Sequence, residues 1–186
     1  AVAKANPSVT AWPLAGAITY GQTLASSALS GGAATPAGSF LFSASSTAPA
    51  AGTAAQGVIY APADTTNYNV MHGSANVTVS RAALTAAADA KRKPYGAANP
   101  PLTVRYSGFV LGQDAAALSA APTASTAVDA STPVGVHAGA ITVSGGVAAN
   151  YAFSYEAADF TVTEAIDPVK AGGADRERCY PIAVLV

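Results

Sequence analysis

Short stretches in which apolar and polar residues alternate run along most of this chain, and Gly, Pro, Asn and Asp separate them. In SANVTVS, for example, Ala75, Val77 and Val79 fall on one face of an extended strand and the residues between them on the other. Successive side chains of a strand point to opposite faces, so a period of two predicts short antiparallel strands with one buried face. The same pattern recurs in LTVRYSG, GAITVSG and ADFTVTE. Only GQDAAALSA differs, because Asp114 can cap the alanine run after it, which predicts one short helix.

The same order of landmarks occurs twice along the chain. A Tyr-Gly pair at 20–21 recurs at 95–96, and an Asn-Tyr pair at 67–68 recurs at 150–151, each Asn-Tyr pair being followed by a strand that contains Thr-Val. The two kinds of pair lie farther apart in the second copy, which predicts one length change between them. Self-similarity of this kind is typical of tandem modules that share one structural plan.

The repeat divides the chain into two expected modules, at 1–82 and 83–165, with almost no linker between them. A unit of about 80 residues buries only a modest core. Residues 166–186 depart from the pattern, since charged residues crowd together there before an apolar end, YPIAVLV. We interpret this segment as a linker or the start of a further module. The short junction predicts a stiff, elongated pair of mostly β modules.

Composition narrows the classes of function. Charged residues make up 10% of the chain and the net charge is −1, which gives no electrostatic footprint for nucleic acid or an anionic membrane. No apolar run approaches the roughly 18 residues that cross a bilayer, so we expect no membrane insertion. The single cysteine, Cys179, excludes an internal disulfide framework. The first residues, AVAKANPSV, lack the features of a signal peptide, so we expect the leader of an exported parent protein to lie outside this sequence.

The repeated pairs are expected to hold the fold. Asn suits a turn, and the Tyr after it can bury its ring while its hydroxyl bonds to the backbone, a role that we assign to Tyr68 and Tyr151. Asp64 precedes Tyr68 in a D-x-x-x-Y spacing that resembles the tyrosine corner of immunoglobulin-like sandwiches. The second module has no aspartate at the equivalent place. Gly21 and Gly96 are expected to permit tight turns beside their tyrosines.

A ligand would most simply be contacted by aromatic side chains, and the candidates are Trp12, Tyr106 and Tyr155. An exposed patch of these rings favours glycan binding, whereas a featureless Ser, Thr and Ala surface favours a spacer. The sequence contains none of the motifs of serine hydrolases, nucleotide-binding loops or zinc proteases, so we expect no enzyme and no cofactor. His72 and His137 fall in different modules and near no cysteine, so no metal site is expected.

Three weaker alternatives stay open. A calcium ion shared at the junction would use Asp89 and Asp159. A Lys-Asn cross-link of the kind that bacterial surface domains sometimes form would join a lysine of the basic run at 91–93 to Asn150, with Glu156 nearby. The basic run itself is interpreted as a solvated loop, with contact to an anionic glycan as the other option.

The combined pattern resembles the tandem immunoglobulin-like repeats of large bacterial secreted proteins. The second unit, with RKPYGAANPPLTVRYSG and NYAFSYEAADFTVTE, is similar to the MBG domain, a β-grasp-like module of bacterial adhesins and filamentous-haemagglutinin-type proteins. The family usually carries Thr-Tyr-Gly-Asp where this chain has PYGA at 94–97. The resemblance implies an all-β or mostly β chain, with an immunoglobulin-like sandwich at 1–82 and a β-grasp-like module at 83–165. It brings no catalytic residues to transfer.

For function, the resemblance implies a non-catalytic extracellular spacer of a bacterial surface adhesin, whose partners are neighbouring repeats of the same chain. One alternative is an adhesive module that binds a glycan or a host surface protein. Another is an accessory domain of a secreted polysaccharide-active enzyme.

Overall fold

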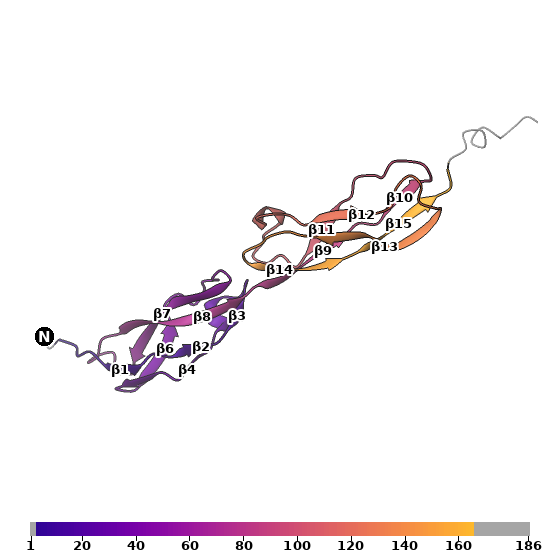
Figure 1. Ribbon diagram of the computed structural model, residues 1–186. Coiled ribbons are helices and arrows are strands. Elements are labelled where there is room, and N and C mark those ends of the chain that lie inside the picture. Colours follow the sequence, from indigo (N-terminus) through magenta and orange to yellow (C-terminus); the bar gives the residue numbers. More distant parts are fainter. Residues whose placement is uncertain (1–2, 166–186) are drawn as a thin grey trace, which may run out of the picture.

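The computed structural model describes residues 3–165 and places them in two β modules that lie end to end (Figure 1). It is 52% strand, with no full helix in the described part, so the predicted mostly β fold is confirmed. The first module holds strands β1 to β8, and the second holds β9 to β15. Residues 166–186, with Cys179 among them, lie outside the described residues, and so does the prediction of a linker or further module.

The first module is built around a four-stranded sheet in the order β3-β8-β7-β6. Strands β6, β7 and β8 are antiparallel to one another in turn, whereas β3 runs parallel to β8. Two short antiparallel pairs, β1 with β5 and β2 with β4, complete the module. The strands are β1 (Ser8–Ala11), β2 (Leu14–Ala15), β3 (Ile18–Thr19), β4 (Leu29–Ser30), β5 (Ala33–Thr35), β6 (Gly38–Phe42), β7 (Gly52–Pro62) and β8 (Met71–Ser80), with a 3-10 turn η1 (Leu24–Ser26).

The second module has two sheets, in the orders β10-β15-β13-β12 and β11-β9-β14. Strand β10 runs parallel to β15 and β14 runs parallel to β9, and the remaining pairs are antiparallel. The strands are β9 (Ala82–Ala88), β10 (Lys91–Pro94), β11 (Val104–Ser107), β12 (Thr123–Thr126), β13 (Gly135–Ser144), β14 (Tyr151–Glu156) and β15 (Ala158–Thr163), with a 3-10 turn η2 (Ala115–Ala117).

The two modules share one strand plan. The order β10-β15-β13-β12 repeats the order β3-β8-β7-β6, and in both sheets an outer strand runs parallel to the last strand of the module. The amide of Tyr20 donates to the carbonyl of Ser80, and the amide of Tyr95 donates to the carbonyl of Thr163, both at 2.8 Å. From the sequence, we expected an immunoglobulin-like fold for the first module and a β-grasp-like fold for the second. Their main sheets have the same order, so the modules differ chiefly in their secondary sheets and loops.

The largest loop difference lies just before the edge strand of the main sheet. Residues 36–37 join β5 to β6, whereas residues 108–122 join β11 to β12. This loop is 13 residues longer, whereas the spacing of the landmark pairs widens by only 8, so other segments of the second module are shorter and the predicted single length change is wrong in detail. The short helix expected here is only one 3-10 turn, and Asp114 caps it by accepting a hydrogen bond from the Ala116 amide at 2.8 Å.

Small side chains on one sheet face large ones on the other in the core of the second module. Ala86 and Ala88 of β9 are fully buried, in one cluster with Ile141 of β13 and with Phe160 and Val162 of β15. Facing small against large residues lets two sheets interdigitate at the density of protein interiors. The alanine-rich sequence therefore forms a dense core with few aromatic residues.

Candidate functional site: the junction between the modules

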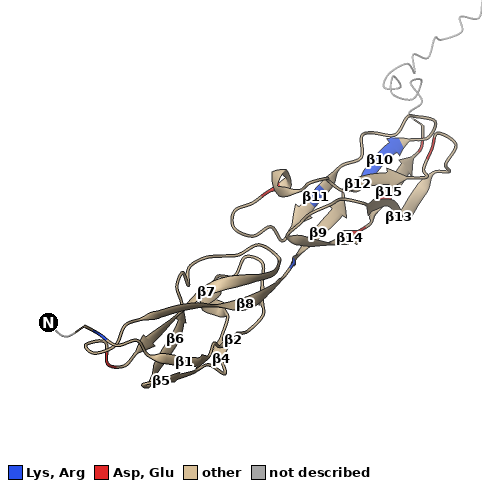
Figure 2. Ribbon diagram, turned by 60° about the vertical axis from the view of Figure 1, so that its left-hand side comes forward, with Lys and Arg blue, Asp and Glu red and all other residues tan. Residues whose placement is uncertain are grey.

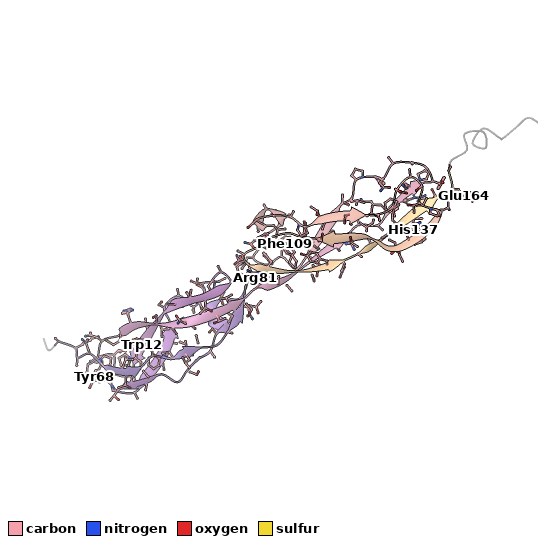
Figure 3. All side chains as sticks on the ribbon, in the orientation of Figure 1. Trp12, Tyr68, Arg81, Phe109, His137 and Glu164 are labelled. Atoms are coloured by element: carbon pink, nitrogen blue, oxygen red, sulfur yellow. The ribbon has the colours of Figure 1, made fainter. Side chains whose placement is uncertain are left out.

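A single residue, Arg81, separates the last strand of the first module from the first strand of the second, at the waist of the molecule in Figure 3. Ser80, before it, accepts the hydrogen bond from Tyr20, and Ala82, after it, donates to the carbonyl of Asn150 at 3.0 Å. Each flanking residue is thus held by its own module. The two modules are therefore joined without a flexible linker.

One apolar cluster runs through the junction. Its buried members come from both modules: Ile18, Tyr20, Leu24, Val77 and Val79 from the first, and Ala82, Leu84, Ala148 and Tyr151 from the second. Burial of apolar surface stabilises a contact by roughly 25 cal/mol per Å² removed from water. Separation of the modules would expose part of this cluster to water, so the shared core favours one fixed arrangement.

Two tyrosines, one from each repeated pair, meet in this cluster. The rings of Tyr20 and Tyr151 pack edge to face, with centroids 5.5 Å apart, and are 7% and 2% exposed. Both hydroxyls approach the side-chain oxygen of Gln113, at 3.3 Å from Tyr20 and 2.6 Å from Tyr151. Phe109 packs edge-on against Tyr151 with centroids 5.3 Å apart. Edge-to-face contacts with bonded hydroxyls fix the orientation of the rings as well as their burial.

Gly21 is required at this contact for two independent reasons. It adopts a φ of +98°, which residues with a Cβ rarely take. A Cβ at this position would also lie 2.9 Å from Cγ2 of Val110, in the loop at 108–122 of the second module. The turn of the first module therefore fits against that loop only because the residue is glycine.

The asparagine of the second Asn-Tyr pair bonds to both modules. The Asn150 side-chain oxygen accepts a hydrogen bond from the Ala51 amide of the first module at 3.0 Å. Its carbonyl accepts the bond from Ala82 at the start of β9. Asn150 thus ties the loop before β7 to the start of β14. In the first module the Asn67 side chain donates to Asp64 instead, at 2.8 Å.

The tyrosine corner expected at Asp64 and Tyr68 does not form as predicted. Tyr68 is only half-buried, and within residues 3–165 its hydroxyl makes no hydrogen bond. Asp64 instead accepts hydrogen bonds from the amides of Thr66 and Asn67, both at 3.1 Å, and so builds a local turn. It is the Tyr151 hydroxyl that reaches the backbone, where it accepts a bond from the Val110 amide at 3.2 Å.

Four residues of the junction, Ala51, Phe109, Val110 and Gln113, were not found by reasoning from the sequence. Val110 and Gln113 lie in the loop at 108–122, whose presence was signalled only by the wider spacing of the landmark pairs. The wider spacing indicates that the second module contains additional residues, but it does not indicate which residues they contact. The landmark residues Tyr20, Gly21, Asn150 and Tyr151 were singled out, but not as partners of one another.

The aromatic candidates for ligand contact do not form one patch. Trp12 is half-buried in the first module, and its ring covers Gly73, where a Cβ would lie 2.3 Å from a ring atom. Tyr106 and Tyr155 belong to the second module, on the strands that flank β9. Tyr106 is half-buried. Tyr155 is 44% exposed, and its hydroxyl donates a hydrogen bond to the Gly145 carbonyl at 2.6 Å. All three rings have packing partners within their own modules.

No arrangement for metal binding is found in the part of the chain that the structure describes, where no three His, Cys, Asp or Glu side chains are grouped to hold an ion. Of the two calcium candidates, Asp89 pairs with Arg105 at 2.9 Å and Asp159 accepts a bond from the Gly139 amide at 2.8 Å. Within residues 3–165, no helix has the length and apolar character needed to cross a bilayer.

A hollow of about 240 Å³ lies in the first module. Typical ligand pockets measure about 300–1,000 Å³ and hold a few convergent polar groups. This one has no charged residue in its lining, which consists of Leu24, Ala25, Ser27, Leu29, Phe40, Leu41, Phe42 and Ser45. It therefore offers no constellation for catalysis.

Charged residues are sparse over both modules, and the largest blue part of the ribbon in Figure 2 is β10. The basic run at 91–93 is thus part of a strand, and its interpretation as a solvated loop was wrong. Lys93 is 4% exposed, and its ammonium group donates to the carbonyls of Ala97 at 3.1 Å and Asp129 at 2.5 Å. A buried charge needs such partners. Asn150 bonds to the first module, so these contacts give no support to a Lys-Asn cross-link.

The perturbed carboxylates belong to local structure. Hydrogen bonds from the side chain and backbone of Asn67 lower the pKa of Asp64 below its ordinary value. A hydrogen bond from Thr103, followed in size by one from Arg105, lowers the pKa of Asp89. Asp64 is exposed and Asp89 is half-buried, and both stay ionised at neutral pH. Neither has the raised pKa of a general acid.

Residues 84–161 match the MBG domain family of YGX type, and the chain therefore carries an MBG domain in its second module. The Tyr-Gly pair at 95–96 lies within the match. The match suggests a β-rich, non-catalytic repeat module of the kind that usually occurs in bacterial surface proteins, and no catalytic family matches the chain. Neither a curated protein nor a solved structure gives a significant match.

Proposed function

We propose that this chain is a non-catalytic structural spacer in the extracellular part of a bacterial surface adhesin. The observation that carries the proposal is the apolar cluster that crosses the junction. A shared core and a one-residue connection make two modules behave as one stiff rod. Modules stacked in this way form an extended array in which each unit contacts its neighbours, and such an array holds a distal domain away from the cell envelope.

The alternative is a module that itself binds a glycan or a host surface protein. A glycan platform is usually built from exposed rings, and Trp12, Tyr106 and Tyr155 are divided between the modules and packed within them. A role as an accessory domain of a polysaccharide-active enzyme would need the same kind of surface. The distribution of the rings therefore favours the spacer.

A direct test presents the chain to a glycan array and to a panel of extracellular matrix proteins. The spacer proposal expects no saturable binding at micromolar concentrations. Trp12→Ala and Tyr155→Ala serve as matched variants, since each removes one candidate ring from a different module. Saturable binding that one of these variants abolishes would overturn the spacer proposal and establish an adhesive module.

A further inference from the structure

The Tyr-Gly turn that docks the first module onto the second occurs again at the far end of the second module. In the first turn the Gln22 amide donates to the carbonyl of Thr19 at 3.0 Å, and in the second the Ala97 amide donates to the carbonyl of Pro94 at 3.2 Å. Gly21 and Gly96 both have positive φ, of +98° and +80°. The two turns therefore have the same hydrogen-bond pattern and the same glycine requirement.

Only the surroundings of the two turns differ. Tyr20 is 7% exposed beneath the second module, whereas Tyr95 is 47% exposed. The space beside Gly21 is filled by Val110, whereas no atom of residues 3–165 lies within 4 Å of a Cβ placed on Gly96. The second turn thus presents the surface that the first turn buries at the junction.

A second part of the junction is also repeated. Ala51, which bonds to Asn150, precedes the positive-φ Gly52 at the start of β7. Val134 precedes the positive-φ Gly135 at the start of β13, and Val134 is 53% exposed. Val134 therefore holds the position in the second module that Ala51 holds in the first.

The second turn is held rigidly in place. Lys93 donates to the carbonyls of Ala97, in the turn, and of Asp129, in the loop that leads to β13. The Gly96 amide donates to the carbonyl of Ala130 at 3.2 Å. The turn and this loop are thus bonded to each other, so little order has to be gained when a partner binds.

We propose that Tyr95, Gly96 and Val134 form a docking surface for a further MBG-type module that follows in the same chain. The partner's tyrosine at the position of Tyr151 packs edge-on against Tyr95, and its asparagine at the position of Asn150 bonds at Val134. The proposal rests on the proposed spacer function and names the partner of that spacer.

The long loop decides which kind of module fits. Residues 108–122 supply Val110 and Gln113 to the existing junction, whereas only residues 36–37 occupy the equivalent place in the first module. A module built like residues 1–82 has no counterpart of Val110 and Gln113, so it lacks the residues that contact the Tyr-Gly turn at the junction. The last strand ends beside the turn in both modules, because the Tyr95 amide bonds to the Thr163 carbonyl as the Tyr20 amide bonds to the Ser80 carbonyl.

The test joins a second copy of residues 82–165 directly after Glu164, so that its first residue follows Glu164 as Ala82 follows Arg81. Small-angle scattering of this three-module chain should show a stiff rod of monomeric mass. Tyr95→Ala in the middle module should broaden the distance distribution and lower the denaturation midpoint of that module. The same change in the terminal module, where the turn has no partner, should leave the distance distribution unchanged and is the matched control.

Equal effects of Tyr95→Ala in the two positions would overturn the docking surface, and so would a flexible joint after Glu164 in the unchanged chain. A dimeric mass that Tyr95→Ala returns to monomeric would overturn the assignment to a module in the same chain, because the occupant is then a second copy. Flexibility at the joint after Glu164 with a stiff joint at Arg81 refutes only the docking surface. Flexibility at both joints refutes the spacer as well.

Discussion

At the scale of single residues, equivalent tyrosines have different roles in the two modules. Tyr151 is buried and its hydroxyl bonds to Gln113 and to the backbone of Val110, whereas Tyr68 is half-buried at the opposite end of the first module. The sequence indicated that both tyrosines follow an asparagine in a turn. It did not distinguish them, because the partners of Tyr151 come from a loop far away in sequence.

Tyr151→Phe is therefore expected to lower the free energy of unfolding by roughly 1 kcal/mol, the typical net contribution of one intramolecular hydrogen bond. Tyr68→Phe is expected to leave it unchanged and is the matched control. Urea denaturation of both variants measures the difference. An equal loss in the two variants would show that the hydroxyl of Tyr151 contributes nothing specific to the junction.

Asp89 is expected to make the free energy of unfolding depend on pH in the acidic range. Its pKa is lowered in the folded state by hydrogen bonds from Thr103 and Arg105, so the stabilisation is complete at neutral pH and is lost as the pH falls below about 4. Asp89→Asn should narrow the difference in unfolding free energy between pH 7 and pH 3. Urea denaturation at the two pH values measures it. An unchanged difference would mean that Asp89 does not contribute to acid sensitivity.

At the scale of elements, strands were predictable and the contacts of loops were not. Alternation in SANVTVS and ADFTVTE predicted β8 and β15 because a buried face imposes a period of two. The parallel pairing of β3 with β8 joins distant segments and has no local signature. The 108–122 loop has no repeat partner in the first module, so its role at the junction appears only in three dimensions.

Two glycines in the same turn should respond differently to the same substitution. Gly21→Ala and Gly96→Ala each place a Cβ on a positive-φ residue, at a cost of roughly 1–2 kcal/mol. Gly21→Ala also overlaps Val110, and overpacking adds roughly 1–3 kcal/mol. Chemical denaturation should therefore show the larger loss for Gly21→Ala, and Val110→Ala should restore part of it. A loss no larger than that of Gly96→Ala would contradict the close contact between turn and loop.

At the scale of the whole molecule, the repeat in the sequence indicated two modules with a short connection. The structure adds that the landmark pairs meet: the Tyr-Gly turn of one module packs on the Asn-Tyr segment of the next. This contact could not be predicted from the sequence, because the Tyr-Gly pair and the Asn-Tyr pair can each be explained equally well as an isolated turn. The contact turns two small cores into a continuous one across the junction.

We expect the two modules to tumble as one body. Residual dipolar couplings measured on the intact chain test it most directly, with alignment tensors determined separately for residues 3–80 and 82–165. Equal magnitudes and a common orientation are expected, and a Gly-Ser insertion after Arg81 should make the tensors diverge. Tensors that already differ in magnitude in the unchanged chain would contradict the claim, because they would show that the modules move independently about Arg81.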